Sequence, residues 1–239
     1  MKYIYGPVKS RRLGMSLGIT LTPHKICSFN CIYCQLGQTS EKTREIKEYI
    51  PPQEIVDELK SWLENNVLDA KRLDYITLSG SGEPTLNIAI GQLIAGIKNI
   101  TLVPITVITN ASLLNIASVR KALLGASLIV PSLNAINERV FTEINRPQEA
   151  IETENIISGL IDLRKEFRGK IWLEVMLVKG VNDDLRHIKK LKDAIEKINP
   201  DKIQLNSPIR TTAKENVSSL EKGKLEKIRR ILGDKCEII

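Results

Sequence analysis

The chain contains no long hydrophobic run and few aromatic residues. No uninterrupted apolar stretch approaches the roughly 20 residues that a membrane-spanning helix needs, so we expect a soluble protein. The N-terminus has no apolar stretch followed by a small-residue cleavage site, which predicts a protein of the reducing cytoplasm. Three Phe, two Trp and five Tyr argue against an aromatic stacking surface for single-stranded nucleic acid.

The chain does have enough apolar content for one sizeable core. Hydrophobic residues make up 42% of its 239 residues, which excludes a disordered protein and predicts a single domain over residues 1–239. The formal net charge is +7, from 35 basic and 28 acidic side chains, and it is spread over helices of mixed sign. This excess allows binding to a polyanion but does not by itself indicate one.

Short β-like runs alternate with longer helix-like runs from about residue 17. Strands are predicted at residues 17–23, 74–80, 104–110, 127–135, 170–180 and 202–209, each followed by a helical pattern. The helical tract over 137–168 is expected to break near Arg146 and Pro147. We place the core at about 15–210 and a C-terminal helix at about 218–233.

Six repeats of strand and helix predict one parallel sheet, because such strands are joined by right-handed crossovers. Polar residues such as Glu174 and Asn206 recur on one face of the predicted strands. A sheet covered by helices on both faces would bury such groups unpaired, at about 1–3 kcal/mol each. A barrel lumen that holds a polar ligand would not. The predicted fold class is therefore α/β, a partial (β/α)6 barrel with its chemistry at the C-terminal mouth.

Three of the four cysteines, Cys27, Cys31 and Cys34, lie in the stretch KICSFNCIYCQLG with the spacing CxxxCxxC. A structural zinc site needs four ligands, and a Cys3His site completed by His24 is an alternative that departs from the usual zinc spacing. Three cysteines acting as small buried hydrophobes do not suit the polar residues around them. An iron–sulfur cube needs four ligands, so three cysteines would leave one iron open to another molecule.

The spacing CxxxCxxC directly after the first strand of a βα barrel, with Tyr33 before the third cysteine, resembles the signature of the radical SAM superfamily. The resemblance implies that the three cysteines hold a [4Fe–4S] cluster and that the open iron binds S-adenosylmethionine (SAM). It also implies that the backbone beside Tyr33 meets the adenine. Reductive cleavage of SAM would then give a 5′-deoxyadenosyl radical that abstracts a hydrogen atom, in an enzyme of oxidoreductase or lyase type.

The stretch SGSGEP, Ser79 to Pro84, resembles the Gly-Gly-Glu-Pro motif of the same superfamily, with Ser81 inserted between the glycines. The motif implies that Gly80 and Gly82 bring the backbone close to SAM and that Glu83 receives its amino group. Other strand ends match more loosely: Ser132 and Asn134 are expected to contact the ribose or carboxylate of SAM, with Asn110, Glu174 and Asn206 behind them. Capping of the next helix is the alternative for each.

The N-terminal segment GPVKSRRLGMSLGI and the cysteine loop look most similar to the radical SAM group related to the tRNA wyosine synthases. The chain is shorter than those enzymes and has no extra cysteines ahead of the first strand for a second cluster. Modification of a tRNA base, with Arg11 and Arg12 at the phosphates, is the substrate hypothesis.

Two further hypotheses concern other kinds of function. One is a glycyl-radical activating enzyme, or another radical SAM enzyme that modifies a protein. The other is a cluster carrier without catalysis, which the SAM-binding motif disfavours. The expected partners are SAM and an electron donor such as flavodoxin or ferredoxin. Cys236 is expected to be a free thiol in a charged tail, and Lys179 either a substrate contact, an amine nucleophile or an exposed loop residue.

Overall fold

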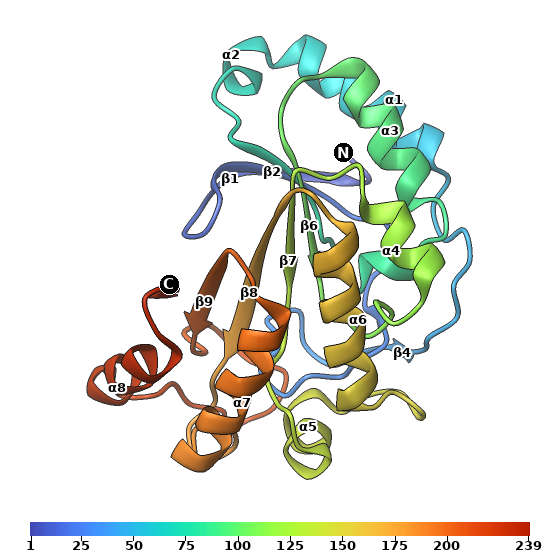
Figure 1. The fold of residues 1–239 in the computed structure, drawn as a ribbon. Coiled ribbons are helices and arrows are strands. Elements are labelled where there is room, and N and C mark those ends of the chain that lie inside the picture. The colour runs from blue at the N-terminus through green and yellow to red at the C-terminus, as the bar shows by residue number, and fades with distance from the viewer.

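An eight-stranded sheet lies at the centre of the computed structural model, which describes residues 1–239 (Figure 1). Its strand order is β1-β2-β5-β6-β7-β8-β9-β10. The strands are β1 (Ile4–Ser10), β2 (Gly14–Ile19), β5 (Tyr75–Leu78), β6 (Ile105–Thr109), β7 (Leu128–Pro131), β8 (Lys170–Met176), β9 (Lys202–Asn206) and β10 (Cys236–Ile238). Only β1 runs antiparallel to its neighbour, and all the other pairings are parallel. The six predicted strands are confirmed.

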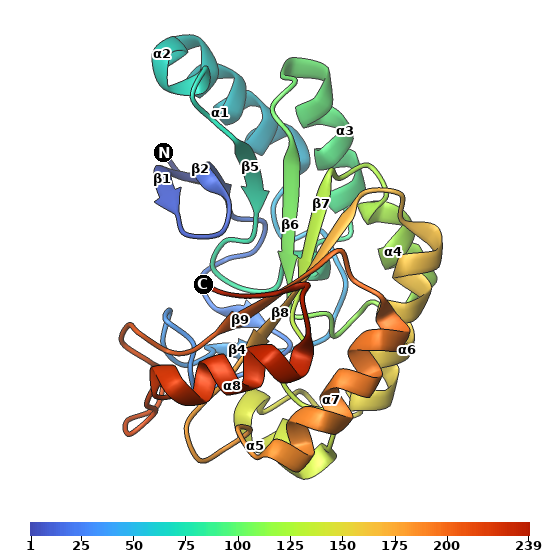
Figure 2. The same cartoon turned by 60° about the vertical axis from the view of Figure 1, so that its left-hand side comes forward.

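Helices alternate with these strands and lie along the outer side of the curved fan that the strands form (Figures 1 and 2). They are α1 (Pro52–Asn65), α2 (Val67–Ala70), α3 (Ile90–Ile100), α4 (Ala117–Leu123), α5 (Glu138–Asn145), α6 (Thr153–Glu166), α7 (Leu185–Ile198) and α8 (Lys222–Leu232), with a 3₁₀ turn η1 (Pro84–Leu86). None combines the length and the apolar character that crossing a bilayer requires. The expected break of the helical tract is confirmed, because Arg146 has a left-handed φ of 46° and ends α5.

Local sequence explains why these helices form and how they face the sheet. α1 begins with Pro52, whose ring suits the first helical turn, and buries Ile55, Leu59 and Trp62 along one face. One hydrophobic cluster of 54 buried residues joins the sheet to the helices that cover it. A single core of this extent holds the strand ends in a fixed arrangement.

The sheet is an incomplete barrel, because its edge strands β1 and β10 do not pair with each other. The predicted α/β class with a partial barrel is therefore confirmed. Alongside the sheet, β3 (Ile26–Cys27) and β4 (Glu41–Lys42) form a small parallel pair that frames the cysteine loop.

Both edge strands were missed in the sequence. β1 contains Gly6 and Pro7, which interrupt a strand pattern, and β10 has only three residues, too few to show alternation. The placement of Cys236 in a charged tail was wrong, because this residue lies in β10 opposite Ile203 and only 4% of its surface is exposed. Its thiol is free, as expected.

Candidate active site

A cavity of about 570 Å³ opens at the carboxyl ends of the parallel strands. All of the site residues predicted from the sequence except Asn134 line it: Cys27, Cys31, Tyr33, Cys34, Gly80, Gly82, Glu83, Asn110, Ser132, Glu174 and Asn206. The carboxyl ends of parallel strands meet at one edge of a sheet, which is where α/β proteins place their ligands. Segments far apart in the sequence thus contribute to one site.

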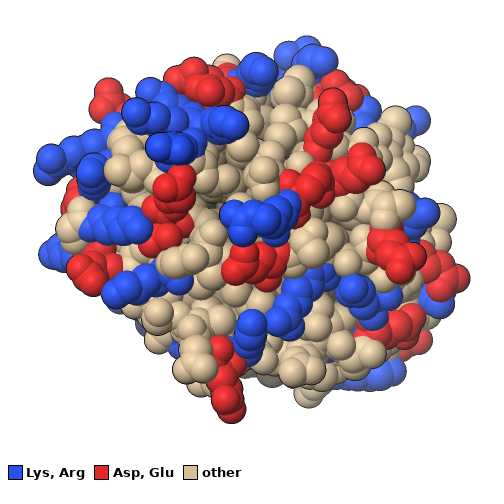
Figure 3. Space-filling view, turned by 90° about the horizontal axis from the view of Figure 1, so that it is seen from below, with Lys and Arg blue, Asp and Glu red and all other residues tan.

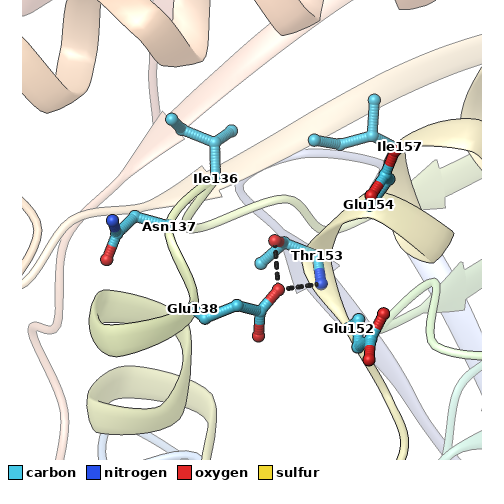
Figure 4. Close-up of a pocket in the computed structure, with 7 residues that line it drawn as sticks. All are labelled: Ile136, Asn137, Glu138, Glu152, Thr153, Glu154 and Ile157. Atoms are coloured by element: carbon cyan, nitrogen blue, oxygen red, sulfur yellow. Dashed lines mark hydrogen bonds between the residues drawn. The ribbon is translucent and has the colours of Figure 1, made fainter.

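A second hollow, of about 630 Å³, lies between the start of α5 and the start of α6 (Figure 4). Glu138, Glu152 and Glu154 contribute carboxylates to it, and no cysteine lines it. Glu138 accepts hydrogen bonds from the backbone N–H and the hydroxyl of Thr153, as the dashed lines in Figure 4 show. This carboxylate therefore ties the two helix starts together, and the hollow offers no thiol that could bind an iron–sulfur cluster.

The cysteine loop is held against the end of α5 by its own backbone. The N–H of Asn30 donates to the carbonyl of Asn145 at 3.1 Å, and the N–H of Ile32 donates to the carbonyl of Ile144 at 3.0 Å. These bonds satisfy carbonyl groups that the last turn of a helix leaves unpaired. The ring of Phe29 also packs edge-on against Phe141, with ring centroids 5.4 Å apart. These contacts hold residues 29–32 of the loop against α5 and do not involve the thiols.

Each of the three sulfur atoms accepts a hydrogen bond from a different side chain. The amide of Asn110 donates to Cys27 Sγ at 3.6 Å, and the amide of Asn145 donates to Cys31 Sγ at 3.2 Å. Lys25 Nζ donates to Cys34 Sγ at 3.0 Å. Donors to sulfur stabilise the thiolate form that binds metal and tune an iron–sulfur cluster.

Burial raises the pKa of the Cys27 thiol to about 12 and that of the Cys31 thiol to about 11, so both are protonated at neutral pH until a metal binds. No three His, Cys, Asp or Glu side chains gather closely enough to bind one metal ion. In an iron–sulfur cluster, by contrast, each thiolate binds a different iron. Three thiols along one cavity wall, each with an N–H donor, are a donor set that fits such a cluster.

Glu83 is a buried carboxylate that links the ends of β5 and β6. Its Oε1 accepts from the hydroxyls of Thr85 and Thr109, both at 2.6 Å, and from the N–H of Thr85 at 3.1 Å. Its Oε2 accepts only from the N–H of Asn110, at 2.7 Å. Burial raises the pKa of Glu83, although these hydrogen bonds oppose that shift. Because a carboxylate oxygen has two lone pairs, Oε2 can accept one more donor from the cavity.

The glycines of the SGSGEP stretch let the end of β5 approach the cysteine loop. Gly80 has a φ of +63°, and a Cβ atom on Gly82 would lie 1.8 Å from the carbonyl oxygen of Ile26. The N–H of Lys25 donates to the carbonyl of Ser81 at 2.7 Å, and the N–H of Glu83 donates to that of Ile26 at 3.1 Å. A close approach to a ligand was expected here, and the close approach observed is between two segments of the chain itself.

Asn134 lies behind Tyr33. Its amide donates to the Tyr33 hydroxyl at 2.7 Å, and its Oδ1 accepts from the backbone N–H of Met176 at 2.8 Å. Asn145 also donates to the Tyr33 hydroxyl, at 3.4 Å. The two asparagines therefore hold the tyrosine ring, which is itself part of the cavity wall.

Glu174 connects three parts of the opposite wall. Its Oε2 accepts from the hydroxyl of Ser132 at 3.3 Å, and its Oε1 accepts from the amide of Asn206 at 3.2 Å. Arg12, in the hairpin turn between β1 and β2, places Nη1 3.0 Å from Glu174 Oε1. The sequence assigned Arg12 to phosphate binding and did not indicate this ion pair, which closes the hairpin over the cavity.

Two residues of the site escaped sequence analysis. Lys25 stands two positions before Cys27, and this proximity was the available signal. Asn145 is 114 positions from Cys31, so nothing in the local sequence connects them.

Comparison with known proteins identifies the family. The family model described as "Radical SAM superfamily" matches residues 21–192. A UPF0026 protein of Methanocaldococcus jannaschii is 34% identical over 239 residues, which cover 100% of this chain and 73% of that protein. A protein of Brachyspira hyodysenteriae called GTPase Obg is 43% identical over 99% of this chain, but the chain spans only 34% of that protein's length. A Sulfurovum protein called dual-specificity RNA methyltransferase RlmN is 25% identical over 72% of this chain and 48% of its own length.

Solved structures share the fold at low sequence identity. A structure of TYW1 with a lysine-pyruvate adduct bound has a TM-score of 0.68 and 21% identity, covering 91% of this chain and 72% of that one. Streptococcus suis SuiB bound to S-adenosylmethionine has a TM-score of 0.67 and 15% identity, covering 93% of this chain and 49% of that one. Likenesses at this level of identity establish the architecture.

Proposed function

The chain belongs to the radical SAM superfamily, and on this premise we propose that it cleaves SAM reductively and abstracts a hydrogen atom from a nucleotide of an RNA, most specifically a tRNA base. Its cofactors are a [4Fe–4S] cluster and SAM. When bound, the cluster supplies the electron that breaks a C–S bond of SAM. The observation that carries the proposal is that the three thiols and the SGSGEP strand end line one cavity.

In this proposal each wall of the cavity has a separate task. Cys27, Cys31 and Cys34 bind the cluster, and Glu83 Oε2 accepts a hydrogen bond from the amino group of SAM. The remaining lining residues that the sequence predicted, together with the backbone at Tyr33, orient the rest of SAM: Gly80, Gly82, Asn110, Ser132, Glu174 and Asn206. Asn134 is proposed to act by holding Tyr33.

Basic side chains at the same cavity support an RNA substrate. Lys9, Arg11, Arg12 and Arg210 line it, against only two carboxylates. Seen from the end toward which the strands run, Lys and Arg side chains gather most densely at the upper left, with carboxylates among them (Figure 3). The net charge of +7 is compatible with a polyanionic substrate. The printed name of the RlmN relative also refers to RNA.

We propose one functional domain over residues 1–239, because one hydrophobic cluster joins its sheet and helices. Flavodoxin or ferredoxin is the proposed electron donor. The cytoplasm is the proposed compartment, since metal-binding thiols persist there in the reduced state.

Deuterium transfer tests the substrate class. Reduced enzyme and SAM are incubated with deuterated cellular RNA or, separately, with deuterated cellular protein, and 5′-deoxyadenosine is analysed by mass spectrometry. We expect deuterium in 5′-deoxyadenosine with the RNA fraction alone. Transfer from the protein fraction instead would favour the activating-enzyme hypothesis. If three basic residues meet phosphates, affinity for the RNA should fall by about 20- to 40-fold between 50 and 200 mM salt.

A conservative change at Glu83 tests the proposed amino-group contact. Glu83→Gln is expected to weaken SAM binding by about tenfold or more, because a hydrogen bond to a charged group contributes about 1.5–3 kcal/mol. The amide also faces the N–H of Asn110, so we expect lower stability as well. SAM affinity is measured by calorimetry on anaerobically reconstituted protein, together with its iron content.

The matched control is Thr109→Val, which removes a donor to Oε1 and leaves Oε2 untouched. We expect this variant to lose stability but to bind SAM like the parent protein. Equal loss of iron and SAM binding in Glu83→Gln would contradict the role proposed for the carboxylate.

A further inference from the structure

Lys25 is a buried lysine whose one side-chain hydrogen bond goes to a cysteine. Only 3% of its surface is exposed, and its Nζ lies 3.0 Å from Cys34 Sγ. No carboxylate lies within ion-pair distance of this ammonium group. A buried charge without an opposite charge costs several kcal/mol, so the position calls for an anion at the sulfur.

The backbone holds Lys25 in place from both sides. Its N–H donates to the carbonyl of Ser81 at 2.7 Å, and its carbonyl accepts from the N–H of Ser40 at 3.1 Å. Its φ is +58°, a left-handed conformation that glycine adopts without strain and lysine does not. Side chains kept at strained positions are concentrated at functional sites.

An iron–sulfur cluster held by the three cysteines would supply the negative charge that the buried Lys25 ammonium group lacks. An oxidised [4Fe–4S]²⁺ core with three thiolates has a net charge of one minus, and the one-electron reduced form has two minus. An ammonium group beside one thiolate offsets this charge and favours the reduced form more than the oxidised form. The donors at the other two sulfurs, from Asn110 and Asn145, are neutral amides, so Lys25 is the one charged donor among the three.

We propose that Lys25 is a positioning residue that supplies the counter-charge of the cluster and thereby raises its reduction potential. The ammonium group acts through Cys34 and the field at the core, without contact to SAM or to the substrate. This inference rests on the proposed ligand set of Cys27, Cys31 and Cys34. It adds a determinant of how readily the cluster accepts the electron that it later passes to SAM.

The test is a set of substitutions at Lys25, measured by anaerobic redox titration followed by electron paramagnetic resonance, without SAM. Lys25→Met removes both charge and hydrogen bond, Lys25→Gln keeps a neutral donor, and Lys25→Arg keeps the charge. The matched control is Lys42→Met, in strand β4. Lys42 is exposed, and its Nζ donates to a backbone carbonyl and not to a cysteine. Iron per chain and thermal unfolding are measured for every variant.

We expect the midpoint potential to become more negative in Lys25→Met and Lys25→Gln, and to stay near the parent value in Lys25→Arg and Lys42→Met. If both neutral variants fold but hold no cluster while Lys25→Arg holds one, the counter-charge is required for assembly, which also supports the proposal. An unchanged or more positive potential in the neutral variants would overturn it. So would loss of the cluster in folded Lys25→Arg, because shape rather than charge would then matter. A parent protein that assembles no [4Fe–4S] cluster would instead refute the ligand set.

Discussion

Replacement of Cys31 by alanine is expected to abolish formation of 5′-deoxyadenosine from SAM under reducing conditions. Its sulfur is one of three that line the cavity, and no fourth cysteine lines the cavity to replace the lost ligand. The loop should keep its shape, because Ile32 and Asn30 bind the end of α5 through backbone hydrogen bonds that do not involve the thiol. The variant therefore separates loss of the cluster from loss of the fold.

Cys236→Ala is the matched control for that experiment. This thiol is free like that of Cys31, but it is buried in β10 and does not line the cavity. We expect the control to form 5′-deoxyadenosine like the parent protein, with about four irons per chain after anaerobic reconstitution. Undiminished activity of Cys31→Ala would show that the cluster lies elsewhere. About two irons per chain, or stoichiometric zinc, in the parent protein would contradict the [4Fe–4S] assignment.

Gly82→Ala is expected to have the second largest effect, on stability and on cluster assembly together. A Cβ atom there would lie 1.8 Å from the carbonyl oxygen of Ile26, the residue directly before Cys27. That oxygen cannot move aside easily, because it accepts the N–H of Glu83 at 3.1 Å. Relief of the overlap must shift either the cysteine loop or the end of β5, at a cost of about 2–3 kcal/mol.

We expect Gly82→Ala to unfold at lower urea concentration and to bind less iron than the parent protein. The control is Gly223→Ala in α8, where nothing lies within 4 Å of the added Cβ. A helical glycine replaced by alanine should gain about 0.5–1 kcal/mol without any change in iron content. Normal iron content and stability in Gly82→Ala would mean that the strand end and the loop do not approach each other as described.

Much of the fold could be predicted because its signals are local. Helix periodicity is read within two or three turns, and six such patterns between β-like runs are sufficient to indicate a parallel sheet. The two edge strands could not be predicted from such local patterns. β1 has a Gly-Pro pair within it and β10 has three residues, so each becomes a strand only because a neighbouring strand offers unpaired backbone groups.

The amino-acid sequence by itself determined the kind of chemistry. Three cysteines spaced CxxxCxxC and the SGSGEP strand end are contiguous stretches, and the spacing of ligands within one loop is a property of the local chain. Such spacing indicates which side chains are available to bind a metal cluster or a ligand. It leaves open what each of them touches.

Only the tertiary structure decided the surroundings of those groups. Asn145 reaches Cys31 across 114 positions, and Asn134 reaches Tyr33 across 101. The carboxylate of Glu83 accepts hydrogen bonds from the neighbouring Thr85 and from the end of β6. Only its Oε2 can accept a further hydrogen bond from a ligand. These contacts depend on which strand ends become neighbours when the core packs, and burial then makes a hydrogen-bond partner obligatory for each polar group.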